Sequence, residues 1–166
     1  MLVLALAGLD SSVKQLVKDT VPVLVGKNPS TDQALEDFAV RRLGDLERDR
    51  DKKYLVRLLR SHATEQQLID DLIDDLTSDS MQSVDQLLAV CTVLGVRDRP
   101  MVESVRSLSD AFDVRNHVIH EMDINFAATN RNRTSRTRAS MVRETNRVLE
   151  VTKTILEAVD ELLSQT

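Results

Sequence analysis

Residues that make turns, cross-links and aromatic cores are scarce in this chain of 166 residues. Three prolines and four glycines are few turn-makers for this length, which indicates long helices with short connections. Aromatic residues make up only 2 % of the sequence, so the core volume must come from leucine, valine and isoleucine. We expect one domain over 1–166, because such a chain buries enough surface without a disulfide or a metal.

A single cysteine, Cys91, excludes an internal disulfide and suits a reducing compartment, so we expect a cytoplasmic protein. No run of roughly 18 apolar residues is present, which indicates that no helix spans a membrane. The apolar segment 1–9 has no basic leader and continues its helical pattern into Val13, unlike an export signal. The sequence also lacks a Gly-rich phosphate loop and the CxxC, HExxH and GxSxG motifs.

The net charge of −5 by itself argues against a nucleic-acid binder. The charge is unevenly distributed, however, because residues 131–147 contain six arginines and one acid, Glu144. A basic segment on an acidic body can hold a polyanion locally, although a solvated loop and helix start would have the same composition. We therefore interpret four arginines of this segment as candidate RNA-backbone contacts. They are Arg131, Arg133, Arg136 and Arg138.

Apolar spacing predicts seven amphipathic helices and no strand, which indicates an all-α, up-and-down helical bundle of about six to seven helices. The predicted helices cover about 2–20, 30–46, 54–59, 64–76, 81–95, 100–122 and 136–164. Capping-box patterns open two of them, at Ser30 and at Thr64. Gly95 fits a helix end, and Pro100 fits the first turn of the next helix.

The first predicted helix has a coiled-coil-like seam that belongs either to the core or to a dimer interface. Its members are Leu2, Leu6, Leu9, Val13 and Leu16. Pro22, Gly26 and Pro29 mark the predicted loop that follows. Cys91 lies on an apolar stripe and is predicted to be a core residue, whereas the acidic run 70–75 is predicted to be a solvated helix face.

A polar motif late in the sixth predicted helix is the main candidate for chemistry. Asp113, Asn116 and His120 are spaced i, i+3 and i+7, so they share one stripe of a helix, and Asn116 can orient the His120 imidazole. Arg115 is about 100° around the helix from Asn116 and about 140° from His120. The guanidinium can span this gap, the helix can loosen there, or two chains can share the site, and the sequence does not choose among these.

The pattern Arg115–Asn116–x3–His120 resembles the R-polar-x3-H motif of the HEPN superfamily, which is common in bacterial toxins and phage-defence ribonucleases. The long first helix and the position of the motif at the end of a late helix agree with this resemblance. It implies a homodimer whose two motifs face each other across a two-fold axis and form a composite Arg/His site. It also implies metal-independent cleavage of RNA without a cofactor, in a toxin–antitoxin or phage-defence system.

The resemblance assigns a role to each residue of the motif. His120 would act as acid or base, since its ordinary pKa is near neutrality. Arg115 would hold the phosphate, Asn116 would position His120 or the phosphate, and His117 would make a secondary phosphate contact. An antitoxin or defence protein is an expected partner. HEPN toxins silenced by a nucleotidyltransferase carry a tyrosine two residues after the motif histidine, where this chain has Met122.

Three alternatives to this interpretation remain open. The motif can be a polar helix face with a salt bridge to Asp113 or Glu121. His117 and His120 can bind zinc together with Glu121 or Asp123. Finally, the chain can be a non-catalytic HEPN-like helical module that binds RNA, a nucleotide or a partner protein.

Overall fold

The computed structural model describes residues 1–43, 64–120 and 136–165. Over these ranges the chain forms seven α-helices and no strand, which confirms the all-α prediction. The helices are α1 (Leu2–Leu24), α2 (Pro29–Leu43), α4 (Thr64–Ser78), α5 (Val84–Val93), α6 (Arg99–Arg106), α7 (Ser109–His120) and α8 (Arg138–Gln165). The predicted helix at 54–59 lies outside the described residues. None of the helices in these ranges is long and apolar enough to cross a membrane.

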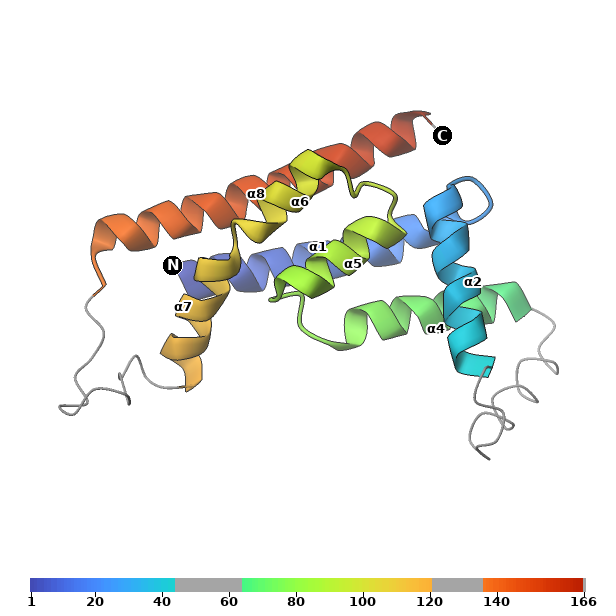
Figure 1. Cartoon of the computed structure of the whole chain (residues 1–166), viewed down its shortest axis with the longest axis horizontal. Coiled ribbons are helices and arrows are strands. Elements are labelled where there is room, and N and C mark those ends of the chain that lie inside the picture. The colour runs from blue at the N-terminus through green and yellow to red at the C-terminus, as the bar shows by residue number, and fades with distance from the viewer. Residues whose placement is uncertain (44–63, 121–135, 166) are drawn as a thin grey trace.

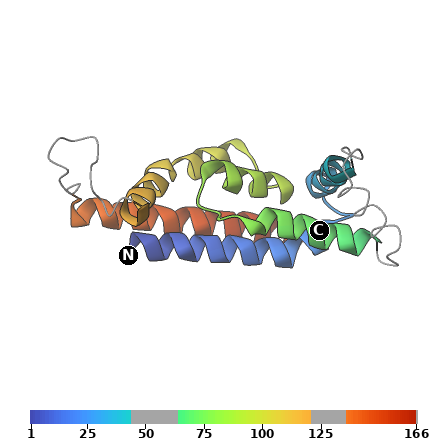
Figure 2. The same cartoon turned by 90° about the horizontal axis from the view of Figure 1, so that it is seen from below.

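The helices are arranged in two layers (Figures 1 and 2). α1 lies between α8 and α4 in the first layer, and α5, α6 and α7 cover one face of it. α1 and α8 run in the same direction, and α4 runs in the opposite one (Figure 1). α7 crosses α1 and α8 at the end of the molecule where α1 begins. This end therefore also holds the start of α8.

The buried face of α1 forms the centre of the core. Its predicted seam is buried in the chain itself at Leu2, Leu6, Leu9 and Val13, each at most 1 % exposed, whereas Leu16 is only partly buried. The buried face continues through Val17, Val21 and Leu24. Opposite it, α8 buries Val148, Val151, Ile155 and Val159. Because the seam is used within one chain, it is not a surface for a second copy.

Two boundaries differ from the sequence prediction. The predicted loop begins too early, because Pro22 lies inside α1, which continues to Leu24. The Pro22 ring is exposed, so the helix loses one backbone hydrogen bond there without a steric conflict in the core. The predicted helix over 100–122 is divided at Ser107 and Leu108, between α6 and α7. Leu108 is fully buried at this turn, so packing of the core accounts for the change of direction.

The start of α2 is also capped differently from the prediction. Asn28, not Ser30, provides the cap: its Oδ1 accepts from the Ser30 N–H at 2.9 Å and from the Thr31 N–H at 3.2 Å. Pro29 is then the first helical residue, where its missing N–H has no partner to lose. Asn28 is nearly buried, because this turn packs against the end of α5.

The end of α5 matches the prediction for Gly95. The Val96 N–H donates to the Cys91 carbonyl at 2.9 Å and the Gly95 N–H donates to the Thr92 carbonyl at 3.0 Å. This pattern requires a left-handed residue, and Gly95 has φ +73°. A Cβ atom at Gly95 would lie 2.6 Å from Nδ2 of Asn28. The backbone conformation and the contact with Asn28 therefore both select glycine.

Replacing Gly95 with alanine tests this junction. We expect Gly95→Ala to lower the free energy of unfolding by about 2 kcal/mol or more, from the strained φ and the contact with Asn28. Gly26→Ala is the matched control, because Gly26 has φ +77° but open space around the added Cβ. Urea denaturation should show a loss of only about 1 kcal/mol for the control. Equal losses in the two variants would mean that the contact with Asn28 imposes no constraint.

Candidate functional site

α7 presents part of the polar segment on its exposed side. The helix packs through Ala111 and Phe112, which are 0 % and 4 % exposed, and Asp113, Asn116 and His117 lie on the solvent side. The predicted stripe of Asp113 and Asn116 is therefore exposed. His120 is the last residue of α7, and its side chain lies outside the described part of the structure.

Arg115 lies between the packed and exposed sides of α7. Its side chain is partly buried, and Nη1 donates to Oδ1 of Asn116 at 3.0 Å. The guanidinium is thus drawn around the helix toward the exposed stripe, across the angular gap expected from the sequence. α7 is α-helical through His120. The contact joins Arg115 to Asn116 only, since the side chain of His120 lies outside the described part of the structure.

His117 is anchored to its own helix. Its Nδ1 lies 2.9 Å from the Asp113 carbonyl oxygen, one turn earlier. A carbonyl oxygen only accepts hydrogen bonds, so this contact favours the tautomer with the proton on Nδ1. His117 is exposed and shares the solvent side of α7 with Asn116.

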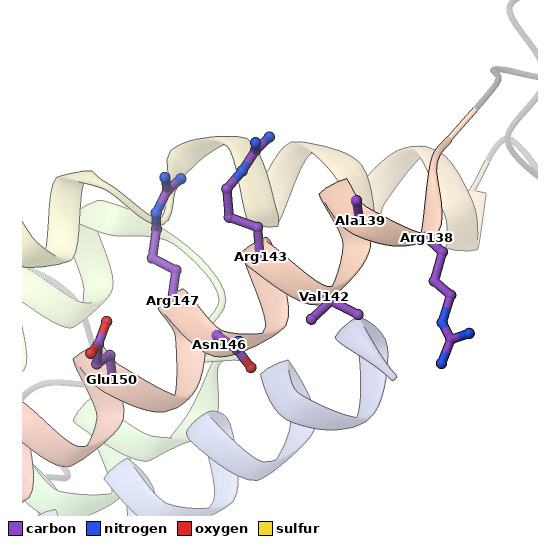
Figure 3. Close-up of a pocket in the computed structure, with 7 residues that line it drawn as sticks. All are labelled: Arg138, Ala139, Val142, Arg143, Asn146, Arg147 and Glu150. Carbon is purple, nitrogen blue, oxygen red and sulfur yellow. The ribbon is translucent and has the colours of Figure 1, made fainter.

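The candidate RNA-contacting arginines are described only in part. Arg138 is the first residue of α8 and is exposed, and Arg136 lies two residues before the helix and is partly buried. Arg131 and Arg133 lie outside the described residues. Figure 3 shows Arg138 pointing away from Arg143 and Arg147, which follow it along the helix. A surface groove at this end of α8 is lined by Arg138, Ala139, Val142, Arg143, Asn146, Arg147 and Glu150. Because α7 packs against α8, the basic start of α8 and the α7 motif belong to the same end of the molecule (Figure 1).

A buried carboxylate joins two of the α8 arginines. Glu144 is 7 % exposed, and its Oε2 lies 2.9 Å from Nη1 of Arg147 while its Oε1 lies 3.4 Å from Nε of Arg143. Nη1 of Arg147 also donates to the carbonyl oxygen of Ser107 at 3.4 Å. Ser107 ends α6, where a cation is favourably placed against the helix dipole.

This cluster links α8 to the turn that precedes α7. Arg147 reaches from α8 to the turn between α6 and α7, and Glu144 holds its guanidinium there. Neither residue was among the predicted site residues. Two signals in the sequence point to them: Glu144 is the one acid among six arginines in 131–147, and its i,i+3 spacing to Arg147 puts the two on one helix face.

A metal centre and a reactive thiol are both missing from the described part of the chain. No three His, Cys, Asp or Glu side chains converge as metal ligands within the described ranges. The zinc alternative depends on the His120 side chain and on Glu121 or Asp123, which lie outside those ranges. Cys91 is fully buried as predicted, and burial raises the pKa of its thiol to about 11, so it remains protonated and unreactive near neutral pH.

Comparisons with known proteins do not assign the chain to a family. No protein-family model matches the sequence, and the searches of curated proteins and of solved structures gave no match.

Replacing Glu144 with glutamine tests the cluster. We expect Glu144→Gln to lower the free energy of unfolding by about 1–2 kcal/mol, since it removes a buried charge-assisted contact whose arginines are partly solvated. Glu150→Gln, an exposed position one to two turns later, is the matched control and should change stability by less than about 0.5 kcal/mol. Urea denaturation measures both. A Glu144→Gln protein as stable as the parent would show that the cluster does not hold the helices together.

Proposed function

We propose that this protein is a metal-independent endoribonuclease of the toxin or defence type that uses Arg115, Asn116 and His120. The observation that carries the proposal is the contact of the Arg115 guanidinium with Asn116, on the helix stripe that leads to His120. This contact supports a site in which the planar, always-charged guanidinium of Arg115 acts together with the polar side chain of Asn116. The resemblance of Arg115–Asn116–x3–His120 to the HEPN motif supplies the reaction class.

The proposed reaction uses only the RNA and the protein. A base removes the proton of a ribose 2′-hydroxyl, whose oxygen attacks the adjacent phosphorus, and the bond from phosphorus to the 5′-oxygen breaks. An acid returns a proton to the leaving 5′-oxygen. His120 serves as acid or base, and Arg115 offsets the negative charge that grows on the phosphate oxygens. Asn116 keeps the Arg115 guanidinium on the reacting side of α7.

The basic start of α8 is proposed to hold the RNA backbone. Arg136 and Arg138, together with Arg131 and Arg133, would contact phosphates, and His117 would add a secondary contact. This role suits the basic start of α8, which lies at the same end of the molecule as α7 (Figure 1). Phosphate contacts of this kind provide affinity without sequence preference. The proposal also includes a homodimer that completes a composite site, and an antitoxin or defence protein as a regulatory partner.

Substitutions in α7 separate an enzyme from a binding module. We expect His120→Ala to lower the RNA cleavage rate by about 10²–10⁴-fold, because it removes the proposed acid or base. We expect Arg115→Lys to lower the rate by about 10²-fold, because the lysine ammonium cannot bind a phosphate through two parallel hydrogen bonds as a planar guanidinium does. His117→Ala, three residues from His120 on the same helix, is the matched control and should have the smaller effect. Circular dichroism checks that each variant is folded. Cleavage at the parental rate in His120→Ala would reject the enzyme in favour of a helical module that only binds.

Neutralising the arginines tests the proposed RNA contact. We expect alanine at Arg131, Arg133, Arg136 or Arg138 to weaken RNA binding similarly for all sequences. The slope of log affinity against log salt should fall by about 0.7 for each arginine that no longer binds a phosphate of single-stranded RNA. Arg99→Ala is the matched control, since Arg99 is exposed on α6 and paired with Glu103. Parental binding by the quadruple variant, measured by fluorescence anisotropy, would assign these arginines to a solvated surface alone.

A further inference from the structure

The outward face of α8 carries an apolar stripe that no described part of the chain covers. Val142, Leu149 and Leu156 are 37 %, 55 % and 38 % exposed and lie seven residues apart. Seven residues are nearly two helical turns, so the three side chains form one line about 21 Å long. Single exposed apolar residues are ordinary on protein surfaces, whereas a seven-residue repeat is the pattern of a seam between two helices.

Charge on the exposed side of α8 changes sign along the stripe. In the first half of the stripe, before Leu149, α8 exposes Arg138, Arg143 and, in part, Arg147, and it exposes no acid, because Glu144 is buried. In the second half, after Leu149, it exposes four acids and one lysine. They are Glu150, Glu157, Asp160, Glu161 and Lys153. Two copies of α8 side by side therefore match in charge when they run antiparallel and repel when they run parallel.

The same distribution is unfavourable for α8 in isolation. A helix is stabilised by acids in its first turn and bases in its last turn, and α8 has neither. Its arginines instead stand near the positive end of the helix dipole and its acids near the negative end. An antiparallel neighbour brings acids to the first half and bases to the second, which offsets both unfavourable interactions. The opposed dipoles of the two helices add to this effect.

We propose that a second copy of this chain packs its α8 antiparallel against this stripe, with the two-fold axis beside Leu149. Leu149 then meets its own copy, and Val142 faces Leu156 of the partner subunit. Arg143 lies near Glu157 of the partner subunit, and the symmetry repeats this pair on the other side of the axis. A crossing angle of about 20° separates the helix ends, so Arg138 stays outside the central contact.

This inference rests on the homodimer in the proposed function and does not depend on the proposed cleavage of RNA. Antiparallel α8 helices hold the two α7 helices at opposite ends of the pair, because α7 packs near the start of α8. The end of α7 that carries the motif points away from α8 (Figure 1), so the two motifs stand apart and do not face each other across this axis. This arrangement differs from the facing motifs that the HEPN resemblance implies, and the two arrangements bring different residues together at the axis.

RNA is the rival occupant of this face, since the first half of α8 is basic. A polyanion accounts for Arg143 and Arg147, but it does not account for Leu156 or for the acids of the second half. A second copy accounts for both halves and for the repeat of the apolar residues. We therefore assign the face to a second copy, with an area of at least ~1,000 Å² expected for a stable contact.

Cross-linking of the full chain locates the axis. We expect Leu149→Cys to give a covalent dimer with a short bis-maleimide, because a residue on a two-fold axis meets its own copy. The native Cys91 is buried and protonated, so it does not interfere. Val40→Cys, exposed on α2 away from the axis, is the matched control and should give no covalent dimer under the same conditions. Failure of Leu149→Cys to cross-link, or efficient cross-linking through Asn116→Cys instead, would overturn the proposal.

Charge reversal tests the orientation. We expect Arg143→Glu and Glu157→Arg each to weaken dimerisation by about tenfold, and the double variant to restore it, because both copies of the pair are reversed together. Sedimentation of nuclease-treated protein measures association, and circular dichroism confirms folding. Leu149→Asp, which keeps every arginine, gives an independent test and should be monomeric. A double variant no better than the single ones, a dimeric Leu149→Asp protein, or association that disappears when nucleic acid is removed would contradict the antiparallel contact.

Discussion

Burial of one continuous face of α1 is the constraint on which the rest of the structure depends. Leu6, Leu9, Val13 and Val17 are essentially inaccessible, and the helices packed around them come from both halves of the chain. α8 packs against α1, α6 and α7, and its opposite side is left uncovered by the described residues. A substitution that opens this seam would disturb α7 and the exposed face of α8 together, since both are positioned by contacts with α1 or its neighbours.

Glu144 adds a polar contact between helices to the burial of the apolar face of α1. Beside the hydrophobic contacts, Arg147 pairs with Glu144 and donates to the Ser107 carbonyl, which links α8 to the turn before α7. The consequence is a molecule with its polar motif and its basic helix start at one end (Figure 1). Because this carboxylate is buried, α8 exposes no acid before Leu149, and the apolar stripe therefore has a basic first half and an acidic second half.

Much of the fold was predictable because it rests on local patterns. The spacing of Leu2, Leu6 and Leu9 indicated a buried helix face, and the positive φ at Gly95 follows from its place after an apolar helix. Two features that depend on long-range contacts were not predictable. The burial of Leu108 accounts for the break between α6 and α7, and Asn28 caps α2 where this turn packs against the end of α5. At the site, helical spacing indicated the exposed stripe, but the contact of Arg115 with Asn116 depends on a side-chain rotamer that sequence does not specify. The roles of Arg115, Asn116 and His120 in RNA cleavage remain predictions.

The central claim is that this chain cleaves RNA by internal attack and without a metal. The most direct measurement is the chemical identity of the new RNA ends after incubation with the parent protein in excess EDTA. The account predicts undiminished cleavage, with a 2′,3′-cyclic phosphate on one side of each cut and a 5′-hydroxyl on the other, because the 2′-oxygen displaces the 5′-oxygen. Cleavage abolished by EDTA, ends consisting of a 3′-hydroxyl and a 5′-phosphate, or the absence of any cut by the folded protein would contradict it.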